Sequence, residues 1–200
     1  EIGSGLVGSE MCIRDSTYPE AIFTEGSYRT VRDAISDIQD IEPGKEVTDS
    51  YFTLPPHPEA QGLEKELRGR CLHNHITTAT RETALSRFKA LKAGENFHDL
   101  SPELKTTYSN AERTQNTIYM RLKYDEPSGT VVNVRKSMWI HPELDRAISI
   151  REAARLQTFP DSFIFEGTKD SQYQQVGNAV PPFLAKAVAE SIISILDQIQ

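Results

Sequence analysis

The chain has 200 residues, of which 38% are hydrophobic and 26% are charged, and its formal net charge is −7. This length allows one domain or two small ones. The sequence has no continuous apolar run of about eighteen residues and no charged start leading into an apolar core, so neither a membrane span nor a secretory signal is expected. Its two cysteines are too few for a disulfide framework, which favours a reducing, cytoplasmic setting.

Residues 1–16 differ in composition from the other residues of the chain. They are rich in Gly and Ser and show no sustained hydrophobic period. The string GSGLVGSEMCIRDS looks like translated adaptor or assembly-junction sequence, so we expect a non-native leader, with the natural chain truncated before residue 17. The alternative is a natural disordered leader. On the first interpretation Cys12 has no role.

A first amphipathic helix is predicted over residues 28–41. Its apolar positions follow the i, i+3, i+4, i+7 spacing of a helix face: Val31, Ala34, Ile35 and Ile38. Thr30 is the expected cap, and Asp33 lies in the first turn, where negative charge is favoured. Residues 44–61 contain several prolines and are expected to form an extended connector.

Residues 62–140 are the basic part of an otherwise acidic chain. They carry thirteen Lys and Arg residues against nine Asp and Glu. Such asymmetry is compatible with contacts to phosphates on one surface, although an excess of this size is also ordinary. Within the segment Cys71, His73 and His75 alternate, but a zinc motif needs a second pair of ligands that is not there, so no metal site is expected.

A second helix is predicted from Arg81 to about Lys92, capped by Thr80 and followed by Gly94. Its inner side would carry Leu85, Phe88 and Leu91. Its basic residues are Arg81, Arg87, Lys89 and Lys92. Such residues most often form a solvated helix face. In this basic segment they are also candidates for contacts to a nucleic-acid backbone.

The polar stretch 109–117, SNAERTQNT, is expected to be a loop. Arg113, Gln115 and Asn116 have the forked donors and acceptors that can read base edges in a major groove, although most polar loops have no such role. The β-branched and aromatic runs 119–122, 130–134 and 138–140 are expected to be strands, with Trp139 in the core.

Residues 146–182 carry the strongest local signals. Ser149 and Glu152 have the spacing of a capping box at the start of a helix, which Pro160 is expected to end. Gly177 and Asn178 form a turn signal, and Pro182 suits the first turn of a last helix.

That last helix has one apolar stripe: Leu184, Val188, Ile192, Ile195 and Ile199. The stripe needs a partner surface. We expect a sheet or a second chain to cover it, with self-association or packing on the 28–41 helix as alternatives.

The strings REAARLQTFPD (151–161) and GNAVPP (177–182) resemble the ninth and tenth motifs of DNA (cytosine-5) methyltransferases. TVRDAI (30–35) and the pair Asn74-His75 resemble the same family more weakly. The resemblance implies an α+β chain with a small irregular β-rich recognition module and terminal helices of an α/β doubly wound domain. It also implies a division into three parts: 17–61 as the end of a catalytic-domain portion and linker, 62–140 as the target-recognition region, and 141–200 as the returning motifs.

By resemblance, such an enzyme transfers a methyl group from S-adenosyl-L-methionine to carbon 5 of cytosine in a specific double-stranded DNA sequence. Asn178, Ala179 and Val180 would lie beside the cofactor. The candidate DNA contacts are Arg81, Arg87, Lys89, Arg113, Gln115 and Asn116. Arg151 and Arg155 are expected to hold buried ion pairs or carbonyls rather than substrate, and Gln157 has no assigned role.

The catalytic Pro-Cys and Glu-Asn-Val motifs of the family do not occur in this sequence. We therefore expect the chain to be inactive alone and to need a catalytic half, either as the missing part of a truncated chain or as a separate subunit of a split enzyme. A non-catalytic DNA-binding protein is the other alternative. The expected setting is the cytoplasm of a prokaryote or the context of a phage, at the nucleoid.

Overall fold

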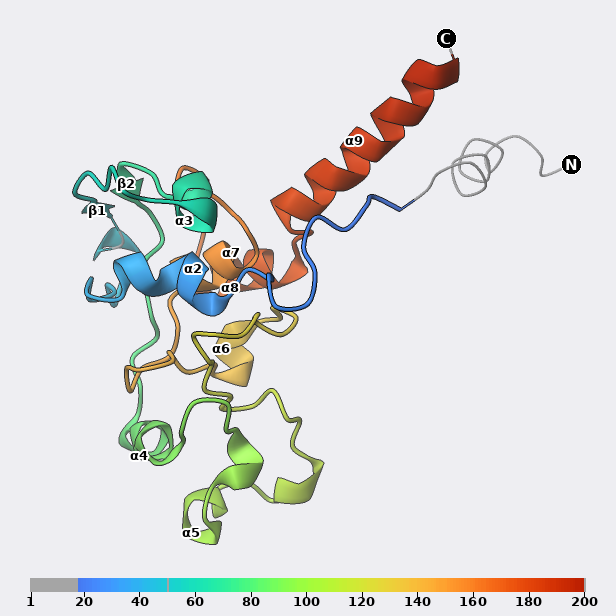
Figure 1. Cartoon of the computed structure of the whole chain (residues 1–200). Coiled ribbons are helices and arrows are strands. Elements are labelled where there is room, and N and C mark those ends of the chain that lie inside the picture. The colour runs from blue at the N-terminus through green and yellow to red at the C-terminus, as the bar shows by residue number, and fades with distance from the viewer. Residues whose placement is uncertain (1–17, 50, 200) are drawn as a thin grey trace, which may run out of the picture. The chain divides into compact units, whose positions relative to one another are not determined.

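The structure, a computed structural model, describes residues 18–49 and 51–199 (Figure 1). The described residues form two compact units, residues 28–179 and residues 18–27 with 180–199. The part of the chain expected to be a leader lies outside the described residues. All three expected segments contribute to the 28–179 unit, so the predicted boundaries at residues 62 and 141 do not separate compact bodies.

Short helices and long loops make up the 28–179 unit. Its α-helices are α2 (Val31–Ile35), α3 (Gly62–Leu67), α4 (Glu82–Ala90), α5 (Pro102–Lys105), α6 (Val134–Ser137), α7 (Ile150–Leu156) and α8 (Lys169–Asn178). Its 3-10 helices are η1 (Ser36–Ile38), η2 (Val47–Asp49), η3 (Phe97–Asp99) and η4 (Ala111–Arg113). Strands β1 (Phe52–Thr53) and β2 (Cys71–Leu72) pair antiparallel, with Phe52 opposite Leu72.

The described residues form helices and one small two-stranded sheet, as expected of a mixed α and β chain, but within residues 62–140 the expected β-rich character is wrong because β2 is the one strand described there. Where strands were predicted between 119 and 140, the chain makes isolated bridges such as Arg121 with Ile140, and residues 134–137 form helix α6. The Asn133 side chain accepts from the backbone N–H of Lys136 and so caps α6, while Met138 ends it in the left-handed region at φ 52°. Local capping therefore overrides the β propensity of this run.

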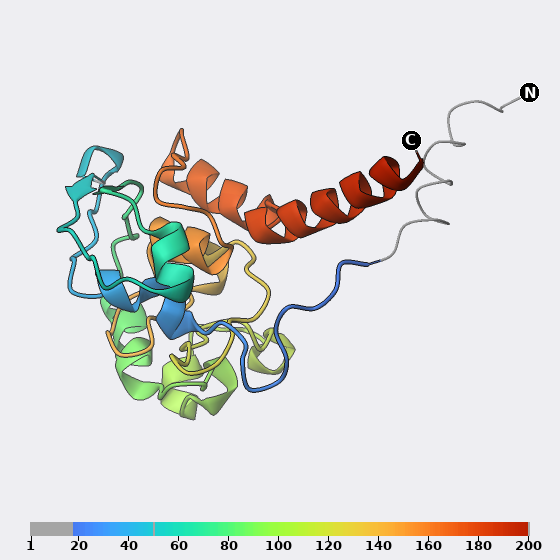
Figure 2. The ribbon, with the colours of Figure 1, turned by 45° about the horizontal axis from the view of Figure 1, so that its top comes forward.

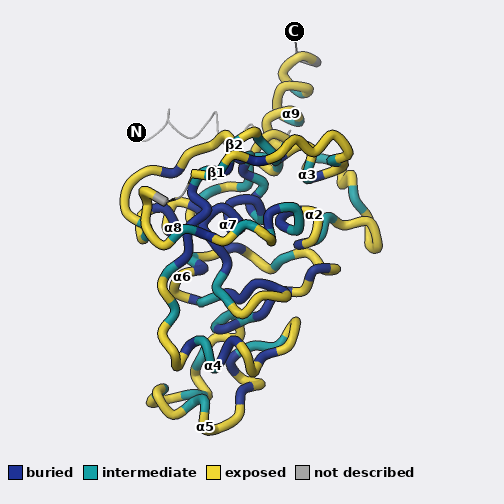
Figure 3. Tube along the Cα trace, turned by 90° about the vertical axis from the view of Figure 1, so that its left-hand side faces the viewer, coloured by how far each residue is buried: buried dark blue, intermediate teal, exposed yellow. Residues whose placement is uncertain are grey.

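The first core surrounds α7. Helix α2 packs against both α3 and α7, and every residue of α7 from Ile150 to Arg155 is buried (Figure 3). The predicted helix over 28–41 is shorter than expected, because α2 tightens into η1 after Ile35. Its capping box between Thr30 and Asp33 is present, and its four predicted apolar residues are buried.

The second core belongs to the lobe that contains α4 and α5, which contact each other and lie at the same end of the unit in two views (Figures 1 and 2). It consists of Ala84, Phe88, Leu91, Phe97, Leu100, Tyr119 and Ile140. The predicted phase of α4 is partly wrong, because Ala84 and Arg87 are buried where Leu85 was expected and is only half-buried. Arg81, not Thr80, is the N-cap residue, and no side chain caps this helix. Trp139 is fully buried, as expected of a core residue.

Two predicted chain breaks around the strongest motifs also differ. Helix α7 ends at Leu156, although Pro160 would allow it to continue to residue 159. It ends earlier because Thr158 takes the left-handed region at φ 63°. Gly177 and Asn178 do not form a turn but complete the last turn of α8. Gly177 instead serves a close approach, because a Cβ built on it would lie 2.7 Å from the carbonyl carbon of Val132.

Helix α9 (Pro182–Ile199) belongs to the other unit and begins at the predicted proline. The apolar side chains of its predicted stripe are exposed at Leu184, Val188 and Ile192. By length and composition alone, residues 169–197 could cross a membrane, with a mean hydropathy of 1.5 and none of the apolar window buried. This helix therefore contradicts the expectation that the chain has no apolar stretch long enough to cross a membrane. A single such helix is a weak sign of membrane insertion, because an apolar helix face that covers a protein surface passes the same test.

We expect Gly177→Ala to destabilise the fold. Alanine favours helix by about 1 kcal/mol over glycine. The added Cβ would, however, meet backbone atoms of Val132 and Asn133 at 2.7–2.9 Å, and overpacking of this kind costs about 1–3 kcal/mol. Urea unfolding followed by Trp139 fluorescence measures the net change in the free energy of unfolding. Gly129→Ala is the matched control, because its nearest neighbour would be the Met120 methyl at 4.0 Å, and equal stability of the two variants would contradict the prediction.

Candidate nucleic-acid interface

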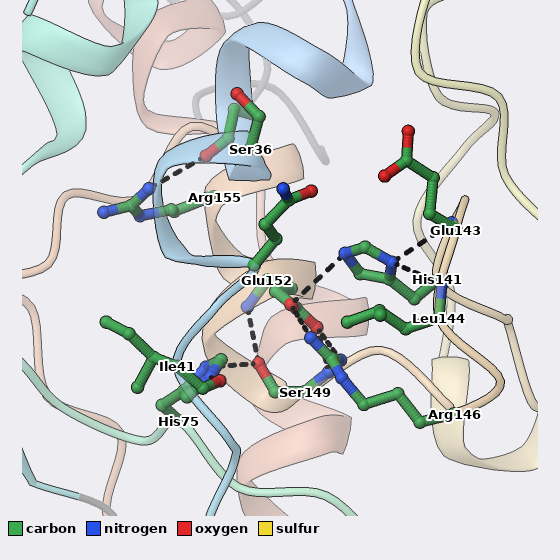
Figure 4. A network of polar contacts seen from close by, with 12 residues as sticks. Ser36, Ile41, His75, His141, Glu143, Leu144, Arg146, Ser149, Glu152 and Arg155 are labelled. Atoms are coloured by element: carbon green, nitrogen blue, oxygen red, sulfur yellow. Dashed lines mark hydrogen bonds and ion pairs between the residues drawn. The ribbon is translucent and has the colours of Figure 1, made fainter.

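A fully buried carboxylate, that of Glu152 in α7, is the centre of a polar network (Figure 4). The Arg146 guanidinium donates to both of its oxygens, from Nη1 at 2.8 Å and from Nη2 at 2.6 Å. The backbone N–H of Ser149 also donates to Oε2 at 2.7 Å, and the backbone N–H of Glu152 donates to Ser149 Oγ at 3.0 Å. The predicted capping box is thus confirmed. Burial acts to raise the pKa of Glu152, but the Arg146 hydrogen bonds and charge outweigh it and lower the pKa to about 2.

His75 connects this capping box to the segment after α2. Its Nε2 lies 2.9 Å from the carbonyl oxygen of Ile41, which can only accept, so the proton is on Nε2. Nδ1 then accepts from the Ser149 hydroxyl at 2.9 Å. Burial lowers the pKa of His75, in keeping with this neutral imidazole. Among the described residues, no three His, Cys, Asp or Glu side chains gather as metal ligands.

His141 faces the same carboxylate from the opposite side. Its Nδ1 accepts from the backbone N–H groups of Glu143 at 3.3 Å and Leu144 at 3.1 Å. Its Nε2 lies 3.3 Å from the Tyr124 hydroxyl and 4.0 Å from Glu152 Oε1. Burial lowers the pKa of His141 to about 4, despite the nearby carboxylate. A proton added at Nδ1 would displace both backbone donors.

Arg151 binds carbonyl groups, as predicted. It donates to the backbone oxygens of His73 at 2.7 Å, Pro160 at 2.9 Å and Phe163 at 2.5 Å. The neighbouring Asn74 has a left-handed backbone at φ 60°, and its amide group donates to Phe165 O at 2.7 Å and accepts from Phe165 N at 3.0 Å. These contacts hold residues 73 and 74, within the expected recognition region, against α7 and the chain that follows it.

Arg155 makes the predicted buried ion pairs. Its guanidinium donates to both oxygens of Asp161, at 2.8 and 2.7 Å, and to the carboxylate of Asp37. It also donates to the carbonyl oxygen of Ala34 at 3.0 Å, where α2 ends. Asp161 in turn accepts from the backbone N–H of Gly69 at 3.1 Å. One arginine therefore holds three separate segments together.

Gln157, which the sequence left unassigned, binds the end of α8. Its Nε2 donates to the carbonyl oxygens of Val176 at 3.0 Å and Ala179 at 3.4 Å. The adjacent Asn178 is exposed, and its Oδ1 accepts from Gln174 Nε2 at 2.7 Å. No sequence signal identifies this role, because a helix end gives no indication of which distant side chain will bind its carbonyls.

The candidate DNA contacts fall into two groups. Those with exposed side chains are Arg81, Lys89, Arg113, Gln115 and Asn116. The loop that carries the last three is shaped by Asn110, whose side chain accepts from the backbone N–H of Arg113, and by His98, whose Nε2 lies 2.7 Å from Thr114 O. These side chains are free of the core and available to a partner surface.

Arg87, in contrast, is only 6% exposed. Its Nε donates to Leu104 O at 2.8 Å, its Nη1 to the Tyr119 hydroxyl at 2.9 Å, and its Nη2 to Thr107 Oγ1. The expectation that Arg87 contacts DNA directly therefore needs correction, because the side chain is buried and each of its three nitrogens already donates inside the lobe. Sequence reasoning placed it on a solvated face because charged residues are seldom buried.

We expect stability to fall steadily as the pH is lowered from 6.5. The pKa of His141 is about 4 in the folded chain against an ordinary value of 6.5, so between these values the unfolded chain binds more protons and unfolding is favoured. Glu152 extends the effect from pH 4.5 to about 2 in the same direction. Protonation of His141 lowers the free energy of unfolding by a total on the order of 3 kcal/mol. Urea midpoints measured from pH 7 to pH 4 check this. His141→Gln should reduce the slope above pH 4.5 and leave the part due to His75, whose pKa is also lowered by burial, and an unchanged slope in that variant would contradict the assignment.

Comparison with known proteins identifies the family of this chain. A family profile described as C-5 cytosine-specific DNA methylase matches residues 13–194. The type II methyltransferase M.DdeI of Desulfomicrobium norvegicum is 35% identical over 191 residues, covering 87% of this chain and 45% of that protein. The type II methyltransferase M1.HphI of Haemophilus parahaemolyticus is 34% identical over 179 residues, covering 90% of this chain and 40% of that protein. The chain thus spans less than half the length of either relative.

A solved structure shares the fold. It is described as a DNA modification methyltransferase encoded within a prophage of Escherichia coli, and it superposes with a TM-score of 0.64 at 24% identity, over 84% of this chain and 47% of that one. The profile match alone extends over far more than half of the 200 residues. The chain therefore belongs to the C-5 cytosine-specific DNA methylase family.

Proposed function

We propose that this chain supplies the target-recognition region and one edge of the cofactor pocket of a DNA (cytosine-5-)-methyltransferase. The observation that carries the proposal is the family match over residues 13–194. The buried contacts of Arg151 and Asn74 support it, because they anchor the start of the 62–140 segment to the helix that bears the ninth motif. A recognition region must be held rigidly if its loops are to discriminate bases.

Within this proposal the 62–140 segment contacts double-stranded DNA through two kinds of side chain. Arg113, Gln115 and Asn116 are exposed on one loop and have the geometry to read base edges. Arg81 and Lys89 are exposed on α4 and suit the phosphate backbone. Base contacts set the sequence preference, whereas phosphate contacts set orientation and affinity.

The family uses S-adenosyl-L-methionine as methyl donor, and the proposal gives Asn178, Ala179 and Val180 a place beside it. Asn178 and Val180 are exposed, so their amide and apolar side chains are open to a ligand. Gln157 holds the carbonyl of Ala179 and so fixes the backbone at this point. When bound, the cofactor supplies the methyl group, and these residues would orient one end of it.

The sequence has no Pro-Cys or Glu-Asn-Val motif, so the proposal assigns the attacking thiolate and the supporting glutamate to a catalytic half outside these 200 residues. That half can be part of the same protein or a separate subunit. The exposed apolar stripe of α9, at Leu184, Val188 and Ile192, is compatible with such a partner surface.

We expect the chain alone to transfer no methyl group from tritiated S-adenosyl-L-methionine to duplex DNA. Joining the upstream half of M.DdeI ahead of residue 17 should give transfer, because that half supplies the thiolate. Replacement of the attacking cysteine in the fused protein is the control and should abolish transfer. Methylation by the unfused chain would overturn the assignment of catalysis to another half.

Single substitutions should separate base readout from backbone contact. We expect Arg113→Ala to lower affinity for the preferred duplex by about 1–3 kcal/mol and to relax preference at one base position. Lys89→Ala should weaken binding to all duplexes alike and reduce the slope of log K against log salt by about 1. Fluorescence anisotropy over a panel of labelled duplexes measures both. Lys65→Ala, with the same charge change on the exposed face of α3, should have no effect. If Arg113→Ala leaves sequence preference intact, this loop does not read bases.

A further inference from the structure

A cavity of about 640 Å³ lies beside α4 in the 28–179 unit. It is bounded by residues 78–81, 83 and 84, by the α6 residues Val134 and Arg135, and by Tyr173 of α8. Three arginines line it, Arg81, Arg87 and Arg135, and no Asp or Glu side chain does. Its other polar groups are mainly threonine and tyrosine hydroxyls. The volume is within the usual range of small-ligand sites, and the lining chemistry favours an anion.

Arg87 makes the wall of this cavity electropositive. Its hydrogen bonds go to the carbonyl oxygen of Leu104 and to the hydroxyls of Thr107 and Tyr119, all of which are neutral. The guanidinium carbon also lies 5.2 Å from the ring centroids of Tyr108 and Tyr119. No ion pair found in the described part of the chain includes Arg87. A buried charge is normally balanced by an opposite charge, so this one leaves a positive potential that an anion in the cavity would balance.

Arg135 lies at the edge of the cavity and is held loosely. It forms an ion pair with Asp170 in the first turn of α8, and the two side chains are 40% and 66% exposed. An ion pair this exposed contributes little to stability. A phosphate oxygen can therefore replace the Asp170 carboxylate, because the arginine fork suits phosphate as well as carboxylate. Arg81 also lines this cavity, is exposed and is available as a second donor.

We propose that this cavity is a phosphate subsite, which holds one backbone phosphate of the bound nucleic-acid strand between Arg81 and Arg135. Arg87 contributes charge from the wall without touching the phosphate. The inference rests on the proposed function for its assumption that the strand is DNA. A strand is favoured over a free nucleotide because α4 continues from Arg81 to the exposed Lys89, which offers a further contact along the same backbone.

The chain contains a matched pair of variants for the test. Arg135 lines the cavity and the adjacent Lys136 does not, yet both are exposed cations of α6. Binding of the intact chain to a fluorescein-labelled duplex is measured by anisotropy over a range of salt. We expect Arg135→Ala to weaken binding about three- to tenfold and to lower the salt slope by about 1, with Lys136→Ala changing neither appreciably. Asp170→Asn should tighten binding, because it removes the competing carboxylate.

A second probe separates this inference from the proposed function. Thymidine 3′,5′-bisphosphate, titrated into the chain by calorimetry, should bind more weakly than the duplex and should lose binding in Arg135→Ala. If the chain binds no duplex but binds this probe through Arg135, the subsite stands and the DNA assignment fails. Equal losses in Arg135→Ala and Lys136→Ala would show diffuse charge attraction and overturn the subsite. Weaker binding in Asp170→Asn, or no binding of either ligand to the parent chain, would also overturn it.

Discussion

The buried carboxylate of Glu152 is the contact on which the rest of this structure depends. It lies on a helix whose residues from 150 to 155 are all buried, so its charge must be balanced inside the protein. Arg146 and the backbone N–H of Ser149 provide that balance. The Ser149 hydroxyl is also hydrogen-bonded to His75, which in turn is hydrogen-bonded to the carbonyl oxygen of Ile41. Loss of any member would leave a buried charge or donor unsatisfied, which is costly because water cannot replace it.

The same helix joins distant parts of the chain through its two arginines. Arg151 binds the carbonyl of His73, and Arg155 binds Asp161 and the end of α2. Polar contacts thus hold residues 73 and 74 against α7, whereas an aromatic and aliphatic core that includes Phe88, Phe97 and Tyr119 holds the lobe of α4 and α5. This division suits the proposed recognition role, in which a polar loop is presented from a fixed base.

Local signals in the sequence predict the caps of α2 and α7, but they fail at Thr80, which does not cap α4, and at Gly177, which lies inside α8. The capping box of Ser149 and Glu152 is predicted from spacing and is present. The cap at Thr30 is also predicted, and the structure adds that Asp33 completes a capping box with it. The start of α9 at Pro182 is predicted from the preference for proline in a first helical turn. Strand predictions between 119 and 140 failed, because β-branched residues there pack as single bridges and a capped helix instead of forming a sheet. The exposed positions of the base-reading candidates agree with a loop, but their contacts with DNA remain a prediction.

The sequence by itself determined the family, through two ordered motifs, and the caps of α2 and α7, through interactions over three residues. Only the tertiary structure decided the roles of Gly177, Gln157 and Arg87. Gly177 meets the backbone of Val132, Gln157 binds a carbonyl of residue 176, and Arg87 is enclosed by Leu104, Thr107 and Tyr119. In each case the partner lies between seventeen and forty-five residues away in the chain. Periodicity and spacing describe neighbours along the chain, whereas burial and charge balance depend on which distant segments the fold brings together.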